Sequence, residues 1–422
     1  MSLELPDFSG LPSELQTWET QGEHVIVGIG EHRIFVRSLG DQDASPTATL
    51  IMLHGYPESS FVYGQSLTAM RERFDRVVVF DFLGFGLSDK PYDHWYSIFD
   101  QADITLQVMR ALGIRGAHLL AHDMGDSVAT ELIYRQVSGQ LPGWFGGFES
   151  VTFTNGNMVM ELANLRLGQQ LLRTPYIGSL PDRGSAILGS NYRVFANQIR
   201  SASGTDLLPE REIELMAAAT NFAGGGRIGH KIVRYLDERD RFQTSRWLPA
   251  VANVDIPVHV CWGTADAVAP REVAEHLTTV VRPDATLTLL DGVGHFCMQE
   301  APAEWNEAVP ALWQQARPPE SPTAQYREGR AHFIWIGRVQ LRHERALLST
   351  RGSDHVTARV SDQAFTPELV ASVEAGLIAS DNPHLVLACP CRCQQCPLID
   401  AHSWPPGCEE DGRCTLINKR PE

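Results

Sequence analysis

The chain has 422 residues, enough for a large core and roughly two or three structural units. With 43 % hydrophobic and 20 % charged residues it has the composition of an ordinary globular protein. The net charge is −16 and no long basic run occurs, so we expect no nucleic acid and no membrane surface as partner. The N-terminus lacks a signal-peptide pattern and no apolar run is long enough to span a bilayer, so we expect a cytoplasmic protein.

The first part of the chain alternates strand patterns with helix patterns. Short apolar or alternating runs predict strands at residues 24–30, 32–40, 48–55, 76–84, 116–123 and 150–156. Helical periodicity predicts helices at residues 59–73, 97–112 and 125–137. Because the connections are short and the two kinds of element alternate, the sequence predicts an α/β fold with a mostly parallel, doubly wound sheet.

The alternation stops after Asn157. The next stretch has helical patches at residues 158–172, 185–200 and 209–223, and no clear strand. Strands are predicted again at 256–263 and 285–292, and helices at 270–281 and 301–316. We interpret residues 1–156 and 246–317 as one α/β domain, and residues 157–245 as a helical cap over the carboxyl edge of the sheet, where such folds bind ligands. The glycine-rich residues 224–229 lack the lysine of a phosphate loop and predict a flexible turn.

The C-terminal part differs in composition. A proline-rich linker is expected at residues 318–325, followed by a small cysteine-rich domain at 326–422 with a strand at 332–341 and a helix at 366–380. Six of the eight cysteines gather there, at Cys389, Cys391, Cys393, Cys396, Cys408 and Cys414. Such clustering in a cytosolic chain favours a structural zinc site over disulfides, but only one C-x₂-C pair occurs, so redox pairing or a disordered tail stays open. The sequence names no protein partner for this domain.

One motif follows the buried strand at 48–55. It reads His54-Gly55-Tyr56-Pro57. A glycine at this place lets the backbone approach a ligand, and the N–H groups that follow it can point at a developing oxyanion. The Tyr56 N–H is therefore a candidate oxyanion donor.

A second motif has the pattern of a nucleophile elbow, a sharp turn between a strand and a helix. It reads LLAHDMGDSVA over residues 119–129, with Asp123 where such elbows usually carry serine. Ala121 and Gly125 are small, as the crowded turn requires. The N–H of Met124, at the start of the helix, is the second candidate oxyanion donor.

Two further motifs supply an acid and a histidine. Asp266 ends the strand at 256–263 in Gly-Thr-Ala-Asp, and His295 follows Gly-Val-Gly in a loop that could reach the elbow. The order nucleophile, acid, histidine along the chain is that of the triad in hydrolases with this elbow. Each residue alone fits a turn or a loop position, whereas their joint occurrence at three strand ends favours a catalytic triad of Asp123, Asp266 and His295.

These motifs resemble the α/β-hydrolase superfamily over about residues 20–317. "HGYPESS", "DFLGFGLSDKP" and an aspartate-centred elbow are similar to the branch of epoxide hydrolases and haloalkane dehalogenases. The longer stretches "DFLGFGLSDKP…YSIFDQA" and "AHDMGDSVATELIYR" are most similar to the mesoderm-specific transcript group. The resemblance implies an α/β-hydrolase fold with a cap, and names no substrate.

An aspartate nucleophile implies a particular chemistry. A carboxylate is ionised near neutral pH and can attack an sp³ carbon, which gives an alkyl-enzyme ester. His295 would then activate water against that ester, while Asp266 holds the imidazole in the required tautomer. This hydrolase reaction needs no cofactor.

The leaving group is less constrained by the sequence. Dehalogenases of this branch carry a tryptophan after the nucleophile, whereas Met124 has no side-chain donor. Epoxide hydrolases need phenol donors from the cap; the insertion contains Tyr176, Tyr192 and Tyr235, of which we take Tyr176 and Tyr192 as candidates. Opening of an epoxide on a small apolar substrate is thus the leading hypothesis. A haloalkane dehalogenase, an ester or lactone hydrolase, and a non-catalytic partner-binding protein on the same scaffold remain alternatives.

Overall fold

The computed structural model describes residues 6–28, 30–173, 191–315, 346–351, 353–360 and 385–387. Contacts divide the chain into two compact units, one formed by residues 1–137 and 141–318 and the other by residues 138–140 and 319–422. The first unit contains an eight-stranded sheet and the second a three-stranded sheet.

The large sheet is mostly parallel. Its strands are β1 (Glu23–Val27), β2 (His32–Gly40), β3 (Thr49–Leu53), β4 (Arg76–Phe80), β5 (Ala117–His122), β6 (Phe148–Thr154), β7 (Val258–Gly263) and β8 (Thr286–Leu290). They lie in the order β1-β2-β4-β3-β5-β6-β7-β8, with only the β1–β2 and β2–β4 pairs antiparallel. Every strand overlaps a predicted one, so the predicted parallel α/β sheet is confirmed.

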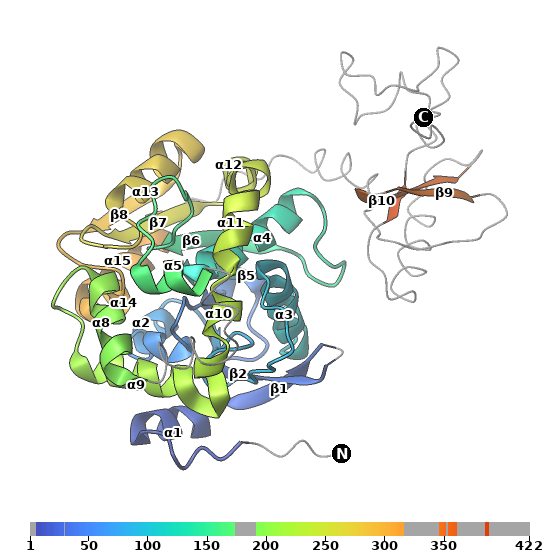
Figure 1. Cartoon of the computed structure of the whole chain (residues 1–422). Helices are drawn as coiled ribbons and strands as arrows, with labels where there is room; N and C mark the ends of the chain where they lie inside the picture. The colour runs from blue at the N-terminus through green and yellow to red at the C-terminus, as the bar shows by residue number, and fades with distance from the viewer. Residues whose placement is uncertain are drawn as a thin grey trace. The chain divides into compact units, whose positions relative to one another are not determined.

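The strand sequences are continuous apolar runs because both faces of the sheet are covered. In β3, Ile51 and Leu53 pack into the core on one face, while Leu50 and Met52 pack into the core on the other. The first face is covered by α3 (Ile98–Ala111), α4 (Met124–Val137), α12 (Leu248–Asn253) and α13 (Arg271–His276), and the second by α1 (Ser13–Thr20), α2 (Leu67–Arg71), α14 (Cys297–Glu300) and α15 (Pro302–Gln315) (Figure 1).

One predicted helix in this unit is divided. Residues 59–73 form a 3₁₀ turn at Ser60–Tyr63 and the short α2 instead of one continuous helix. Asp81, just after β4, accepts hydrogen bonds from both the N–H and the hydroxyl of Ser60, at 2.7 and 2.6 Å. These bonds tie the start of the segment to the edge of the sheet, which periodicity within the segment does not reveal.

Between β6 and β7 the described residues form helices and connecting turns and no strand. The helices before α12 are α5 (Leu167–Arg173), α8 (Tyr192–Ser203), α9 (Glu210–Asn221), α10 (Gly229–Ile232) and α11 (Tyr235–Phe242). We call residues 157–245 the cap; its helices cover one end of the sheet in Figure 1. The predicted helix at 158–172 begins only at Leu167, because the N–H groups of Met160 and Asn164 donate to Gln243 and Val268 instead of to carbonyls one turn back.

The second unit has a small sheet of its own. Strand β10 (Ser353–Val360) pairs antiparallel with β9 (Ala346–Arg351) and parallel with β11 (Leu385–Leu387). The predicted linker at 318–325, strand at 332–341, helix at 366–380 and six clustered cysteines lie outside the described residues, so the zinc site stays a prediction. No helix in the described part of the chain has the length and apolar character needed to cross a membrane.

Candidate active site

Asp123 occupies a sharp turn between β5 and α4. Its φ is +49°, in the left-handed region that a non-glycine residue enters only at a cost of about 1–3 kcal/mol. Two residues on, the turn requires glycine, because a Cβ on Gly125 would lie 2.6 Å from the carbonyl oxygen of Leu53 and 2.8 Å from that of His54. The turn thus holds the Asp123 carboxylate at the carboxyl edge of the sheet, beside the end of β3.

The loop after β3 places an N–H group on this carboxylate. The Tyr56 N–H donates to Asp123 Oδ1 at 2.8 Å. Gly55 permits the approach, since a Cβ there would lie 2.6 Å from the Asp123 Cβ. His54 shapes the loop: its Nδ1–H donates to the Gly55 carbonyl at 2.8 Å and its Nε2 accepts from the Phe82 N–H at 3.0 Å.

His295 joins Asp123 to Asp266. Its Nε2 lies 3.7 Å from Asp123 Oδ2, and its Nδ1 lies 2.8 Å from Asp266 Oδ2. The other oxygen of Asp266 accepts from the N–H groups of Val268 and Ala269, at 2.6 and 2.9 Å. With both oxygens of Asp266 engaged, the Nδ1–H of His295 is held toward Asp266 and the Nε2 faces Asp123.

The charged side chains of Asp123, His295 and Asp266 are buried together. Burial raises the pKa of the Asp123 carboxyl, although the His295 charge and the N–H groups of Tyr56 and Met124 oppose that rise. Burial also acts against the His295 imidazolium, but the carboxylates of Asp266 and Asp123, with a smaller contribution from Glu58, outweigh it and raise the pKa of His295 to about 9. The raised pKa of His295 therefore favours a histidine cation beside Asp123 in the resting site.

Sequence reasoning missed a residue that supports Asp266. The Asn155 side chain donates from Nδ2 to Asp266 Oδ2 at 2.7 Å and accepts the Gly263 N–H at 2.9 Å. Its own φ is +48°. The available signal was position, because Asn155 follows β6 at the same edge of the sheet as Asp123.

A second missed pair consists of His122, which precedes Asp123, and Glu58, in the loop after β3. His122 Nδ1 lies 3.1 Å from the Thr154 carbonyl, which can only accept, so this nitrogen carries the proton. Burial holds the pKa of His122 well below its usual value and raises the pKa of Glu58 to about 8. Glu58 Oε2 accepts the Gly55 N–H at 2.9 Å and lies 3.3 Å from His122 Nε2, which has no hydrogen-bond partner among the described residues.

The cap contributes two side chains above Asp123. Tyr235 and Arg239 lie one turn apart on α11, and each is only 1 % exposed. Arg239 donates to the Ser127 hydroxyl of α4. Its Nε and Nη1, and the Tyr235 hydroxyl, have no hydrogen-bond partner in the described part of the chain. The Arg239 charge lowers the pKa of Asp123, and the Asp123 charge contributes to raising that of Tyr235, so all three groups act on one another.

Of the two tyrosines named from the sequence, the structure describes only Tyr192, and it lies away from the triad. Tyr192, at the start of α8, is 37 % exposed and donates its hydroxyl to Glu210 at the surface of the cap. It is absent from the described lining of the cavity above the triad. Tyr176 lies outside the described residues. Among the cap tyrosines that the structure describes, Tyr235 is the one whose pKa is affected by the Asp123 charge.

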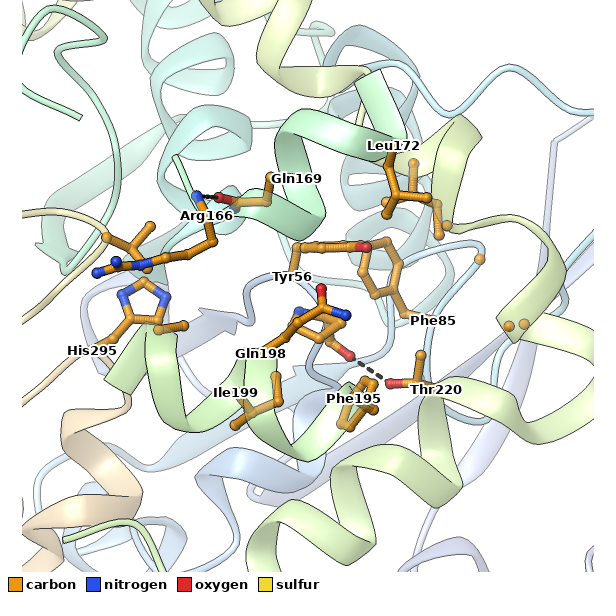
Figure 2. Close-up of a pocket in the computed structure, with 18 of the residues that line it drawn as sticks. Tyr56, Phe85, Arg166, Gln169, Leu172, Phe195, Gln198, Ile199, Thr220 and His295 are labelled. Carbon is orange, nitrogen blue, oxygen red and sulfur yellow. Dashed lines mark hydrogen bonds between the residues drawn. The ribbon is translucent and has the colours of Figure 1, made fainter. Parts of the chain in front are cut away.

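A cavity opens over this group and is shown in Figure 2. Tyr56 and His295 line it from the core, and the glycines of the predicted flexible turn, Gly225, Gly226 and Gly229, line it from the cap. Most of the remaining wall is apolar, formed by Phe85, Leu172, Phe195, Ile199, Ile232, Val268 and Phe296. A buried carboxylate, two N–H donors and a histidine–aspartate pair at the end of an apolar cavity can together perform nucleophilic displacement followed by hydrolysis.

Comparisons with known proteins agree with this architecture. The α/β-hydrolase family matches residues 50–308 of the chain. The protein named LipZ from Mycobacterium tuberculosis is 35 % identical over 71 % of this chain and 97 % of its own length. The mesoderm-specific transcript protein of Mus musculus is 33 % identical over 69 % of this chain and 85 % of its own length.

Solved structures share the fold at lower identity. Epoxide hydrolase A from Mycobacterium thermoresistibile has a TM-score of 0.53 and 18 % identity, and covers 71 % of this chain and all of its own. A haloalkane dehalogenase variant, DbeA-M1 from Bradyrhizobium elkanii, has a TM-score of 0.55 and 20 % identity, over 69 % of this chain and 96 % of its own. The family match spans more than half of the chain, and the relatives named above reach the stated identity and coverage. The chain therefore belongs to the α/β-hydrolase family.

Proposed function

We propose that this protein is a hydrolase in which Asp123 attacks an epoxide and forms a covalent ester. The observation that carries the proposal is the position of the Asp123 carboxylate. One of its oxygens accepts the Tyr56 N–H at 2.8 Å, and the other lies 3.7 Å from His295, which is hydrogen-bonded to Asp266. A carboxylate placed among the partners of a hydrolytic nucleophile fits attack better than a structural role.

In the first step, an Asp123 oxygen forms a bond to an epoxide carbon as the carbon–oxygen bond of the ring breaks. The ring oxygen takes a proton from a general acid, for which we propose Tyr235. Burial and the Asp123 charge hold the pKa of Tyr235 well above its usual value, so the phenol is protonated before the reaction. Its hydroxyl has no hydrogen-bond partner among the described residues, so its proton is not engaged by another acceptor there.

In the second step, His295 takes a proton from water, and the hydroxide adds to the ester carbon of Asp123. The oxyanion forms beside the N–H groups of Tyr56 and Met124. Collapse breaks the ester bond, and the expelled alkoxide takes the proton from His295. The Asp123 carboxyl releases a proton that balances the one given by Tyr235, so the net change is epoxide plus water to diol.

Formation of the ester prepares His295 for its role as a base. In the resting protein, the Asp123 charge contributes to a His295 pKa of about 9. Esterification removes that charge, so the pKa of His295 falls and the imidazolium releases its proton to solvent. The neutral imidazole can then accept a proton from water, and His295 regains the released proton from solvent once the Asp123 carboxylate is restored. Asp266 and Asn155 keep the ring oriented throughout.

Displacement of a halide and hydrolysis of an ester or lactone are alternatives that would use the same nucleophile. A halide leaves without a proton, so a buried phenol beside Asp123 favours an epoxide over a haloalkane. Met124, which follows the nucleophile, has no side-chain N–H for a departing halide. Solved structures of epoxide hydrolases share this fold, which supports the proposal without deciding it.

Trapping of the intermediate tests the proposal. We expect His295→Gln to accumulate an Asp123 adduct with members of an epoxide panel, seen by intact-mass spectrometry and located by peptide mapping. Asp123→Asn is the control and should give no adduct. In the His295→Gln background, Tyr235→Phe should slow adduct formation with epoxides at least about tenfold, because general acid catalysis contributes on the order of 10²–10⁴, and should leave haloalkane alkylation unchanged. A folded His295→Gln protein without any adduct would instead indicate a non-catalytic binding protein.

A further inference from the structure

Arg166 is a permanently charged side chain in the wall of the cavity. It precedes α5, and Figure 2 shows its guanidinium reaching toward the His295 imidazole. The described residues that line the cavity include these two basic side chains and no aspartate or glutamate. The Gln169 side chain accepts the Arg166 backbone N–H at 2.8 Å, which fixes the start of the arginine side chain.

The hydrogen-bonding capacity of Arg166 is only partly used. One terminal nitrogen donates to the Ala267 carbonyl, whereas the Nε is buried and has no partner among the described residues. Nor does Arg166 form an ion pair with a described carboxylate. Asp266 is the nearby acid, but its oxygens already accept from His295, Asn155 and two backbone N–H groups. A buried donor of this kind carries a desolvation cost that an anionic ligand would remove.

The opposite end of the cavity is apolar. In Figure 2, Phe85 and Leu172 lie across the cavity from His295 and Arg166. A ligand would therefore be oriented, with its charged group beside the triad and its hydrocarbon part toward these side chains. A carboxylate placed there would meet the Asp123 anion, and the guanidinium would offset that repulsion.

We infer that the substrate of Asp123 carries a carboxylate next to its electrophilic carbon and an apolar tail beyond it, as a 2,3-epoxy fatty acid does, and that Arg166 binds this carboxylate. The inference deepens the proposed function and rests on it. Guanidinium and carboxylate match in charge and in planar geometry, which gives recognition as well as affinity.

The test compares three epoxides of matched length: 2,3-epoxyoctanoate, the neutral 2,3-epoxyoctanamide and 1,2-epoxyoctane. In the unaltered full chain we expect kcat/KM for the acid to exceed that for the amide. Arg166→Gln should reduce this acid-to-amide ratio at least about tenfold, the effect of losing charge-assisted hydrogen bonds. Circular dichroism reports whether the variant is folded.

Two control variants sharpen the result. Arg166→Lys keeps the charge without the planar fork, so we expect an intermediate ratio. Arg193→Gln removes a charge from the cap surface, on α8, and should leave the ratio unchanged. An unchanged ratio in Arg166→Gln, or a preference of the unaltered protein for the amide, would overturn the inference while leaving epoxide hydrolysis intact.

A binding measurement separates the inference from turnover. Octanoate has the carboxylate and the tail but no epoxide. In the Asp123→Asn background, where the opposing charge is absent, we expect calorimetry to detect octanoate binding that weakens at least about tenfold when Arg166→Gln is added. Equal binding in the two proteins would overturn the carboxylate site. Failure of every epoxide to react or to label Asp123 would overturn the proposed function and the inference together.

Discussion

The charge of Asp123 changes the proton affinity of His295, and the proposed two-step reaction depends on this coupling. The carboxylate raises the affinity of the imidazole for a proton while it is ionised, and ceases to do so once it is esterified. In the proposed reaction the same residue would be the nucleophile in the first step and would control the pKa of the base in the second. The coupling can be measured in the resting protein without any substrate.

We expect Asp123→Asn, which has nearly the shape of the ester state, to lower the pKa of His295 below its value of about 9. A pH titration of the carbon-bound imidazole protons by NMR would follow this, with the His295 signal assigned from its loss in His295→Gln. Asp291→Asn, at an exposed position before the histidine loop, is the matched control and should leave the pKa unchanged. A His295 pKa that does not move in Asp123→Asn would contradict the coupling.

Among single residues of the site, those that stand in recognisable turns could be identified from the sequence. Asp123, Asp266 and His295 each follow a strand within a motif rich in small residues, and the structure brings them together. The cap residues Tyr235 and Arg239 could not be chosen in this way. Helical periodicity shows which face of α11 is buried, but only the packing of cap on core shows which side chain reaches Asp123.

Among the elements, the elbow between β5 and α4 is the one that tolerates least change. Two opposed effects act on Gly125→Ala: alanine favours a helix by about 1 kcal/mol, whereas overpacking costs about 1–3 kcal/mol. The clash should dominate because the new Cβ would lie 2.6 Å from a carbonyl oxygen of β3, a central strand that cannot shift easily.

We therefore expect Gly125→Ala to lower the urea midpoint, followed by circular dichroism, and to reduce adduct formation on Asp123. Gly143→Ala is the matched control: a Cβ at Gly143 meets nothing within 4 Å, and its φ is not in the left-handed region. Its stability should change by less than about 0.5 kcal/mol. Equal midpoints for the two variants would show that the elbow is not sterically constrained.

The elements themselves were predictable to different degrees. Buried strands such as β3 and β5 are short apolar runs that end in turn residues, so their signal is local. The helix predicted at 158–172 lacks its first half because the Met160 and Asn164 N–H groups bond to distant partners. Local periodicity contains no information about such bonds, which form only when the cap packs on the core.

For the whole molecule, the buried groups around the site link stability to pH. Burial raises the pKa of Glu58 from an ordinary 4.5 to about 8. Between these two values the folded protein keeps a proton that the unfolded chain releases. The free energy of unfolding therefore falls as pH rises through this interval, and the Glu58 contribution levels off above pH 8.

We expect Glu58→Gln to remove this dependence. The amide oxygen of a glutamine can accept the Gly55 N–H, as Glu58 Oε2 does at 2.9 Å, and the amide cannot ionise. The melting temperature of Glu58→Gln should thus exceed that of the unaltered protein by a margin that grows between about pH 5 and 8. Scanning calorimetry across that range measures the margin, with the exposed Glu72→Gln as control. His295, whose pKa is raised from 6.5 to about 9 in part by Glu58, adds its own pH dependence above pH 6.5, so the margin between pH 5 and 6.5 reports on Glu58 itself. Melting curves that run parallel across this range would mean that Glu58 is ionised in the folded protein and would contradict its raised pKa.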